Sequence, residues 1–513
     1  MLRSWDLNLQ INRDNQSALY LQIAEKIIDE IRLGRLSPSS VMPGTRELAD
    51  RLRVNRKTIV LTYDELIAQG WLVAENRRGT FVSPNPPATA YGQSHERLID
   101  SDIKTVPVES RRSDPGYEFN DGQPDTRLMP LDALSRAFRH ALLSVSRHRH
   151  PEADAGKGLY ELRSAIATML NMEMGLHTHP ENLCMARSCQ MAAYLIGRAL
   201  MKPGDVLAIA RLSSPAVRET FQACGARIAD IALDSMGMDI DALERLCSTT
   251  KVSMVHISPQ HQYPTTVSLS PERRKKLLKL AARHDFLILE SDEESEFNFS
   301  QQPVFPLASE DSEGRVIYIG NLSKILAPEL RVSYVAATST IVDRLAREVA
   351  LFDQHNNNAI EMTIAELMRS GEIKRHSLKM TKVYQDRRDH FQQLIDDELW
   401  QWVDYQSPQS GLAFWLRFKE AVDIKRMAKR SREEKIHFAF GKTYSAAGEE
   451  VPAMRLGYAH MNEKEMQQGF QRLKHIVVSC LVATIISCCS ATELIEMSPM
   501  SSGLVKMSHT LED

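Results

Sequence analysis

Residues 42–82 read MPGTRELADRLRVNRKTIVLTYDELIAQGWLVAENRRGTFV, and this stretch decides the fold at the start of the chain. Thr45 and Asn55 are side chains of the kind that cap helix N-termini, so each marks the start of a helix. Gly70 ends the second helix, and a hairpin with a polar turn follows it. The expected elements are helices over 46–52 and 56–69 and strands over 71–74 and 80–82.

Apolar residues at helical spacing predict a further helix upstream, and Gly34 follows as its stop. They are Tyr20, Ile23, Ile27 and Ile31. Helices joined by a tight turn and followed by a basic-tipped hairpin make a winged helix-turn-helix, which is a DNA-binding fold. A purely structural helix pair with solvated charges is the alternative, but spacing, caps, wing and basic tips all agree with DNA binding.

The second helix of the pair is expected to present its N-terminal residues to base edges. Its free amide groups and positive dipole end also suit phosphate. The start of the preceding helix and the tip of the wing are placed to reach the DNA backbone or the minor groove. The predicted DNA-binding residues are therefore Arg46, Asn55, Arg56, Lys57, Thr58, Arg77, Arg78 and Gly79.

The composition is that of a globular protein with more than one domain. The 513 residues are 43% hydrophobic and 25% charged, and the net charge of -3 means that any DNA-binding face is local. The seven cysteines show no zinc-ligand spacing and predict reduced thiols and no metal site. No secretory signal is visible, and the apolar run 476–491 is short for a membrane span, so we expect a cytoplasmic protein without a membrane role.

Four segments are expected along the chain. Residues 1–83 form the winged helix-turn-helix, and the polar, Pro-rich residues 84–117 form a linker. Residues 118–478 alternate short β-branched runs, such as VLAIA (206–210), with helical runs, which predicts an α/β domain with a mostly parallel sheet. Residues 479–513 are expected to be a tail, possible in a disordered state, for which the sequence suggests no role.

One motif in the α/β domain carries chemistry. In GNLSKILAPELR (320–331), Lys324 follows a strand and a small turn, where its amine could form a Schiff base. Arg331 could supply a cation to a phosphate, and Ser323 could add a hydroxyl. Taken alone the motif is weak, because Ser-Lys pairs are common and most lysines are surface residues.

Further words in a fixed order strengthen this interpretation. They are FNDGQPDTRLMP (119–130), GKGLYELRSAIATML (156–170), ISPQHQYPTT (257–266), LESDEESEF (289–297) and AMRLGYA (453–459). With the lysine motif they resemble a fold type I aminotransferase domain, which uses pyridoxal phosphate. Residues 42–82 resemble the GntR family of bacterial transcription regulators. The combination resembles the MocR subfamily over roughly residues 15–478, an extent that suits two joined domains.

The resemblance implies roles for individual residues. Lys324 matches the lysine that holds pyridoxal phosphate, Arg331 the phosphate-binding arginine, and Arg455 the arginine that grips an amino-acid carboxylate of an effector. A turn before a helix N-terminus would cup the phosphate, and two residues would line the cofactor ring. The further candidates are Ser323, Ser188, Cys189 and Gln190 for the phosphate end, and Gln262 and Tyr263 for the ring.

The chain also departs from the family pattern. It reads Glu-Ser-Asp-Glu-Glu over 290–294, where the family expects Glu-Asp-Asp-Tyr-Asp, so Ser291 replaces the acid that keeps the pyridine nitrogen protonated. Asp292 could substitute only by a one-residue shift, which turns a strand side chain to the other face; it is kept as a cofactor-binding candidate. The other departures are Glu293 for a tyrosine, Ser214 for a stacking aromatic, Ala153 for a tyrosine, and Ser188 and Thr266 for glycines.

These features favour a transcription regulator over an enzyme. The aminotransferase-like domain would bind pyridoxal phosphate as a sensor or structural ligand, respond to a small amino compound, and form a homodimer whose two modules address two operator half-sites. Efficient transamination is not expected. Two alternatives stay open: a working aminotransferase with an accessory DNA-binding domain, and a regulator whose large domain is a cofactor-free scaffold.

Overall fold

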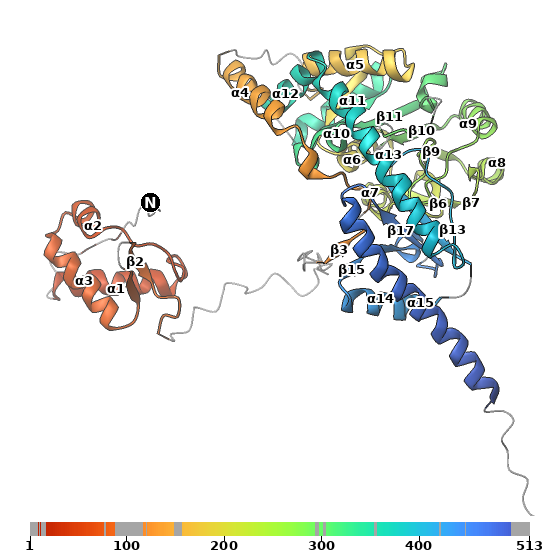
Figure 1. The fold of residues 1–513 in the computed structure, drawn as a ribbon. Coiled ribbons are helices and arrows are strands. Elements are labelled where there is room, and N and C mark those ends of the chain that lie inside the picture. The colour runs from red at the N-terminus through yellow and green to blue at the C-terminus, as the bar shows by residue number, and fades with distance from the viewer. Residues whose placement is uncertain are drawn as a thin grey trace, which may run out of the picture. The chain divides into compact units, whose positions relative to one another are not determined.

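The computed structural model describes residues 9, 11, 17–75, 78–87, 116–119, 121–147, 156–292, 297–300, 304–352, 357–419, 422–446 and 448–493, with side chains as far as residue 480. The chain divides into two compact units, residues 1–112 and 113–513, and each unit is described by itself (Figure 1). None of the helices in the described part of the chain is both long and apolar enough to cross a membrane.

The smaller unit is the expected helix-turn-helix with its wing. Helix α3 begins where predicted, because the Asn55 side chain accepts a hydrogen bond from the amide of Lys57 at 2.9 Å. The prediction that Thr45 caps α2 is wrong: Gly44 is the extended residue before the helix, and Thr45 is its first helical residue. The elements are α1 (Leu19–Arg32), α2 (Thr45–Leu52), α3 (Arg56–Ala68), β1 (Leu72–Glu75) and β2 (Gly79–Val82).

The three helices of this unit enclose one apolar core. Ile23, Ile27 and Ile31 of α1 face Ile59 and Leu66 of α3, and all five are buried. This is the face that the helical spacing predicts. The core holds α3 firmly, so the polar residues at its N-terminus are left on the outside of the unit.

A seven-stranded sheet forms the centre of the larger unit. Its strand order is β4-β12-β11-β10-β9-β5-β6, and β12 alone runs antiparallel to its neighbours. The short β-branched runs of the sequence are these strands, which are buried on both faces. The strands are β4 (Leu183–Ala186), β5 (Val206–Ala210), β6 (Arg227–Ile231), β9 (Val252–Ile257), β10 (Leu287–Asp292), β11 (Val316–Asn321) and β12 (Ser333–Ala336).

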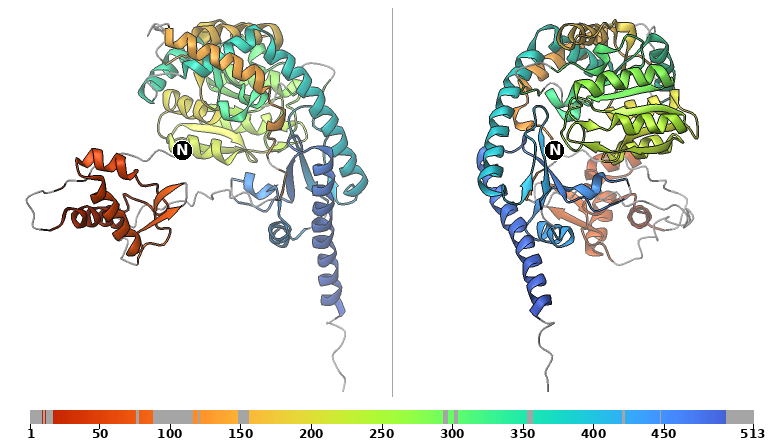
Figure 2. Two further views of the ribbon diagram at one scale, coloured as in Figure 1. Left: turned by 60° about the vertical axis from the view of Figure 1, so that its left-hand side comes forward. Right: turned by 90° about the vertical axis from the view of Figure 1, so that its right-hand side faces the viewer.

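Helices cover both faces of this sheet and complete an α/β architecture (Figure 2). One face packs against α6 (Cys189–Leu200), α7 (Pro215–Ala223) and α11 (Ser339–Phe352). The other face packs against α5 (Tyr160–Met174), α8 (Ile240–Thr249), α9 (Pro271–His284) and α12 (Asn358–Arg369), with α4 (Leu131–Arg147) on α12. A small hairpin pairs β7 (Leu233–Asp234) with β8 (Gly237–Met238).

A second, antiparallel sheet belongs to the same unit, with strand order β13-β14-β17-β16. One of its faces joins an apolar core with α13 (Glu372–Glu398), α14 (Ile424–Glu433) and α15 (Glu463–Glu493). Side chains alternate along its strands, so Trp415 and Arg455 lie on the other face, which contacts Tyr263 of the large sheet's edge. The strands are β13 (Val403–Asp404), β14 (Ala413–Phe418), β16 (Ala439–Phe440) and β17 (Ala453–Gly457).

The chain enters the larger unit through a short anchored strand. Strand β3 (Tyr117–Glu118) pairs with β15 (Ile436–His437), and the Tyr117 hydroxyl donates to Gln468 of α15 at 2.8 Å. Arg472, also on α15, lies 5.0 Å from the centre of the Tyr117 ring. The end of the predicted linker is therefore fixed to the second sheet's side of the unit.

The C-terminal end departs from the sequence prediction. Helix α15 runs from Glu463 to Glu493, so residues 479–493 are helical where an irregular tail was expected. The prediction missed this because the run lacks a stop signal such as glycine or proline, which would have located the true end. The remaining predicted tail, together with Arg77, Ala153 and Glu293, lies outside the described residues.

Gly320 offers a test of how tightly the lysine motif is packed. It lies on β11 opposite the fully buried Tyr334, and a Cβ added there would stand 2.2 Å from Cζ of that ring. Gly320→Ala should therefore lower the free energy of unfolding of the larger unit by about 1–3 kcal/mol, measured by chemical denaturation. In a Tyr334→Ala background the same change should cost much less; additive effects would contradict the packing described here.

Candidate functional site

The N-terminus of α3 is the outward-facing polar end of the smaller unit. Asn55, Arg56 and Lys57 are exposed, and Thr58 is half-buried. The Nε atom of Arg56 lies 3.4 Å from Oγ1 of Thr45, which links the starts of α3 and α2. The free amides, the helix dipole and these side chains together suit a phosphate-bearing groove. Arg46, at the start of α2, is exposed as well.

The wing adds a second basic position. Arg78 donates to Glu75 at 2.6 Å, and its guanidinium carbon lies 5.6 Å from the centre of the Phe81 ring. Gly79 is exposed and has a φ of 119°, a conformation that glycine adopts readily and that turns the hairpin. The side chain of Arg78 is therefore partly held by its own wing, and it would exchange Glu75 for phosphate on contact with DNA.

In the larger unit, the topology brings the predicted ligand residues to one edge of the sheet. Lys324 lies in α10 (Ser323–Leu326), directly after the end of β11. Strand β12 starts at that edge and runs back beside β4, with Ser333 opposite both Asn321 and Ala186. The turn after β4 and the turn after β11 are therefore neighbours. This edge, outside the carboxyl ends of parallel strands, is where α/β proteins bind ligands.

The turn between Lys324 and β12 is braced by Ser323. Its hydroxyl accepts from the amide of Val332 at 2.7 Å and lies 3.2 Å from the carbonyl oxygen of the same residue. Arg331, just before, has a φ of 52° in the left-handed region and an exposed side chain. The predicted hydroxyl of Ser323 thus holds the backbone that presents Arg331. Lys324 itself is half-buried.

The turn after β4 supplies the start of helix α6. Ser188 caps this helix by accepting from the amide of Met191 at 3.1 Å, and Cys189 Sγ lies 3.7 Å from the hydroxyl of Ser333 on β12. Gln190 is exposed. The three residues form the first turn of a helix at the sheet edge, an arrangement that favours an anion.

Ser291 and His256 occupy the next positions along the edge. The Ser291 hydroxyl lies 3.0 Å from Nε2 of His256, which comes from the neighbouring strand β9. His256 is buried, and burial together with repulsion from Arg218 lowers the pKa of its imidazole to about 4. At neutral pH the pair therefore carries no charge. A neutral serine and a neutral imidazole supply no carboxylate to a pyridine nitrogen.

Asp292 does not replace the missing acid. Its carboxylate accepts from the hydroxyl of Tyr318 at 2.8 Å, and Tyr318 belongs to the face of the sheet that packs against α5 and α12. Ser291 points to the opposite face, toward α6, as the alternation of strand side chains requires. The prediction that Asp292 binds the cofactor is therefore wrong: the strand keeps its register, and the carboxylate lies on the other side.

The predicted carboxylate-binding residue, Arg455, lies at the centre of β17 with its side chain fully buried. Its guanidinium donates to the carbonyl oxygen of Pro264 at 2.8 Å and lies 4.8 Å from the centre of the Tyr263 ring. Its Nε atom donates to the carboxylate of Asp121, which also accepts from the Tyr263 hydroxyl. Gln262 is buried next to this group, and its side-chain amide donates to the carbonyl oxygen of Tyr263 at 3.1 Å.

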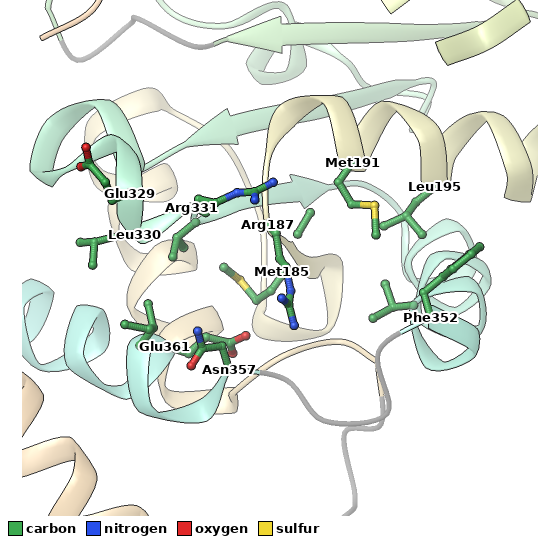
Figure 3. A pocket seen from close by; sticks show the side chains of 14 residues that line it. Met185, Arg187, Met191, Leu195, Glu329, Leu330, Arg331, Phe352, Asn357 and Glu361 are labelled. Atoms are coloured by element: carbon green, nitrogen blue, oxygen red, sulfur yellow. The ribbon is translucent and has the colours of Figure 1, made fainter. Parts of the chain in front are cut away.

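A pocket of about 160 Å³ lies beside Arg331 (Figure 3). Arg187 and Arg331 bring two guanidinium groups to it, and Glu329 and Glu361 bring two carboxylates. Met191, Leu195 and Phe352 form an apolar wall. Lys324 is not among the described residues that line it. The pocket therefore offers a place for the anionic end of a ligand.

The residues at this edge fit one end of pyridoxal phosphate and not the other. Lys324 and Arg331 offer an amine and a guanidinium, with the first turn of α6 nearby. Against this, the position for the ring-nitrogen acid holds Ser291 bonded to His256, and Ser214 at the N-terminus of α7 offers no aromatic ring. The site suits retention of the group more than its use as an electron sink.

The fold and this site define a helix-turn-helix module joined to an aminotransferase-like α/β domain. Residues 117–473 match the family described as aminotransferase class I and II, and residues 19–82 match bacterial regulatory proteins, gntR family. The probable rhizopine catabolism regulatory protein MocR of Rhizobium meliloti is 25% identical over 478 residues, covering 91% of this chain and 95% of that protein.

Two further relatives bracket the resemblance. The HTH-type pyridoxine biosynthesis transcriptional regulator PdxR of Corynebacterium glutamicum is 25% identical, over 76% of this chain and 82% of that protein. The structure of a multiple substrate aminotransferase from Thermococcus profundus aligns with a TM-score of 0.66 and 25% identity, over 72% of this chain and 93% of that one. The chain belongs to the aminotransferase class I and II family and has the architecture of the MocR-type transcription regulators.

Sequence reasoning missed two site residues. Asp121 stands in the quoted stretch FNDGQPDTRLMP, but nothing in its neighbourhood points to a partner 334 positions away. His256 lies inside an apolar strand run, where a buried histidine is usually structural. Only the paired strands reveal that it faces Ser291.

The lowered pKa of His256 gives a pH-dependent prediction. The unfolded chain protonates this histidine below about pH 6.5, whereas the folded chain resists protonation down to about pH 4. Stability attached to His256 is thus present above pH 6.5 and lost as the pH falls. Relative to His256→Asn, the wild type should lose at most about 1.4 kcal/mol of unfolding free energy per pH unit in that window.

The measurement is chemical denaturation of both proteins between pH 4 and 7. The matched control is His177→Asn, which changes an exposed histidine of the same unit. Parallel curves for wild type and His256→Asn would refute the burial argument.

Proposed function

We propose that this DNA-binding transcription regulator holds pyridoxal phosphate through Lys324 and Arg331 as a sensing ligand and not as a catalyst. The observation that carries the proposal is the split at the sheet edge. The anchoring groups adjoin the first turn of α6, while the ring-nitrogen position holds the neutral pair of Ser291 and His256. When bound, such a group supplies a reactive aldehyde that an amino compound can engage.

Each residue of the site has a defined task in this proposal. Lys324 holds the ligand covalently, and Arg331 binds its phosphate with the amides at the start of α6. Ser323 positions Arg331 by fixing the backbone at Val332. Cys189 and Gln190 line the phosphate end, and Tyr263 faces the side where an amino compound would enter.

A working aminotransferase is the second candidate, and the likeness to aminotransferase structures favours it. Its chemistry needs a carboxylate at the pyridine nitrogen, and the nearest acid on the strand, Asp292, is bonded to Tyr318 on the opposite face. A cofactor-free scaffold is the third candidate. Absorbance separates all three: a band that bleaches with keto-acid release supports the enzyme, and no band after reconstitution supports the scaffold.

On the DNA side, we propose that a homodimer places two α3 helices in successive major grooves of an operator with two half-sites. The exposed Arg56 and Lys57 at the start of α3 would contact bases and phosphates, and Arg78 on the wing would contact the backbone. An amino compound at the larger unit would change the DNA affinity by favouring one state of the dimer.

Replacement of Lys324 tests the ligand half of the proposal. Full-length protein incubated with pyridoxal phosphate and dialysed should show a band at roughly 420 nm, a property of the bound cofactor. Lys324→Ala should lose the band and the mass increment that borohydride reduction fixes to the chain. Lys374→Ala, which removes an exposed lysine paired with Glu173, should retain both. An unchanged band in Lys324→Ala would overturn the assignment.

Replacement of Arg56 tests the DNA half. The probe is a duplex selected from a random library by the full-length protein, and binding is measured by fluorescence anisotropy at several salt concentrations. Arg56→Ala should weaken binding by about 1–3 kcal/mol, and Lys57→Ala should lower the salt slope by about one. Lys26→Ala changes an exposed lysine on α1 and should leave both quantities unaltered. Equal losses in all three variants would contradict the orientation of α3.

A further inference from the structure

The carboxylate of Asp121 occupies the guanidinium that would otherwise be available to a ligand. Arg455 is fully buried, whereas about a third of the Asp121 side chain is exposed, at 34%. The acid therefore stands between the buried cation and solvent. Asp121 precedes Gly122, whose φ of 62° lets the chain turn sharply at this point.

Asp121 is held by two partners at once. One carboxylate oxygen accepts from Nε of Arg455, and the other accepts from the hydroxyl of Tyr263. Burial and the neighbouring charge of Asp121 raise the pKa of the Tyr263 phenol, so the hydroxyl remains a donor. The Tyr263 ring packs edge-on against Tyr444, with ring centres 5.3 Å apart, which fixes the hydroxyl in place.

A ligand carboxylate would have to compete with this arrangement. An acid of the same chain acts at an effective concentration in the millimolar range or above, which free ligand must exceed. A ligand carboxylate that entered beside Asp121 would place two negative charges against one guanidinium. The second contact of Arg455, the carbonyl oxygen of Pro264 at 2.8 Å, leaves its planar fork partly used in a buried setting.

We propose that Asp121 is a specificity-determining residue that takes the place of a ligand carboxylate on Arg455. The site then excludes amino acids and admits amines that lack a carboxylate at that position. This inference rests on the proposed function in taking an amino compound as the ligand, but the occupation of Arg455 by Asp121 is independent of any cofactor. Asp121→Asn removes the competing charge and converts the site to one that accepts carboxylates.

The first experiment measures carboxylate binding alone, by calorimetry on full-length protein as purified. The probe is 3-phenylpropionate, with 3-phenylpropanol as its uncharged counterpart. Asp121→Asn and Asp121→Ala should bind 3-phenylpropionate at least about tenfold more tightly than wild type, an effect typical of freeing a buried charged partner. Asp234→Asn should match wild type, because it removes an acid from a surface pair with Arg273.

Two outcomes overturn the proposal. Wild type binding 3-phenylpropionate as tightly as the Asp121 variants would show that Asp121 yields to a ligand. No binding by variants that keep their circular dichroism and melting transition would show that Asp121 does not block the site. If neither Asp121 variant folds, Tyr263→Phe loosens the acid by removing its second partner; it should then gain carboxylate binding, and no gain refutes the proposal.

The second experiment separates this inference from the proposed function. Protein reconstituted with pyridoxal phosphate is titrated with 2-phenylethylamine and with L-phenylalanine, which differ by the carboxylate. Wild type should change its absorbance with the amine at a concentration at least about tenfold lower, and Asp121→Asn should narrow this preference. Equal response of wild type to both compounds refutes the inference alone. Absence of any cofactor band refutes the proposed function and leaves the carboxylate measurement as the test.

Discussion

The hydrogen-bonded ladder of the antiparallel strand β12 is the constraint on which the larger unit's site depends. By pairing with β11 on one side and β4 on the other, β12 makes two turns neighbours that are more than a hundred residues apart in sequence. The turn with Lys324 and Arg331 and the turn that opens α6 meet for this reason. Ser323 then ties the first turn to the beginning of β12, so the ladder and the turn hold each other in place.

Much of this could be predicted because the signals are local. Asn55 caps α3 through an amide two positions away, and the β-branched runs are the strands they predict. Errors arose where a local signal was ambiguous or absent. Thr45 has the chemistry of a cap, but the extended residue is Gly44; and residues 479–493 lack a helix stop, so their continuation of α15 was missed.

The site was predictable in part for the same reason. The motif around Lys324 is contiguous, whereas the fate of Asp292 depends on the face to which β10 turns it, and that is settled by its packing against Tyr318. The pair of Asp121 and Arg455 joins the first and last parts of the domain, 334 positions apart. No periodicity or spacing reports such a contact. The chemistry that distinguishes this chain from an aminotransferase lies in these long-range neighbours.

The anchoring of β3 has a mechanical consequence. Tyr117 is clamped to β15 and α15, and only three residues separate it from Asp121 on the way into the domain. The attachment point of the interdomain tether and the acid that guards Arg455 are therefore parts of one short piece of chain. Tension applied along the tether is borne by this clamp before it reaches the ligand site, and any displacement of Asp121 is felt first at the root of the tether.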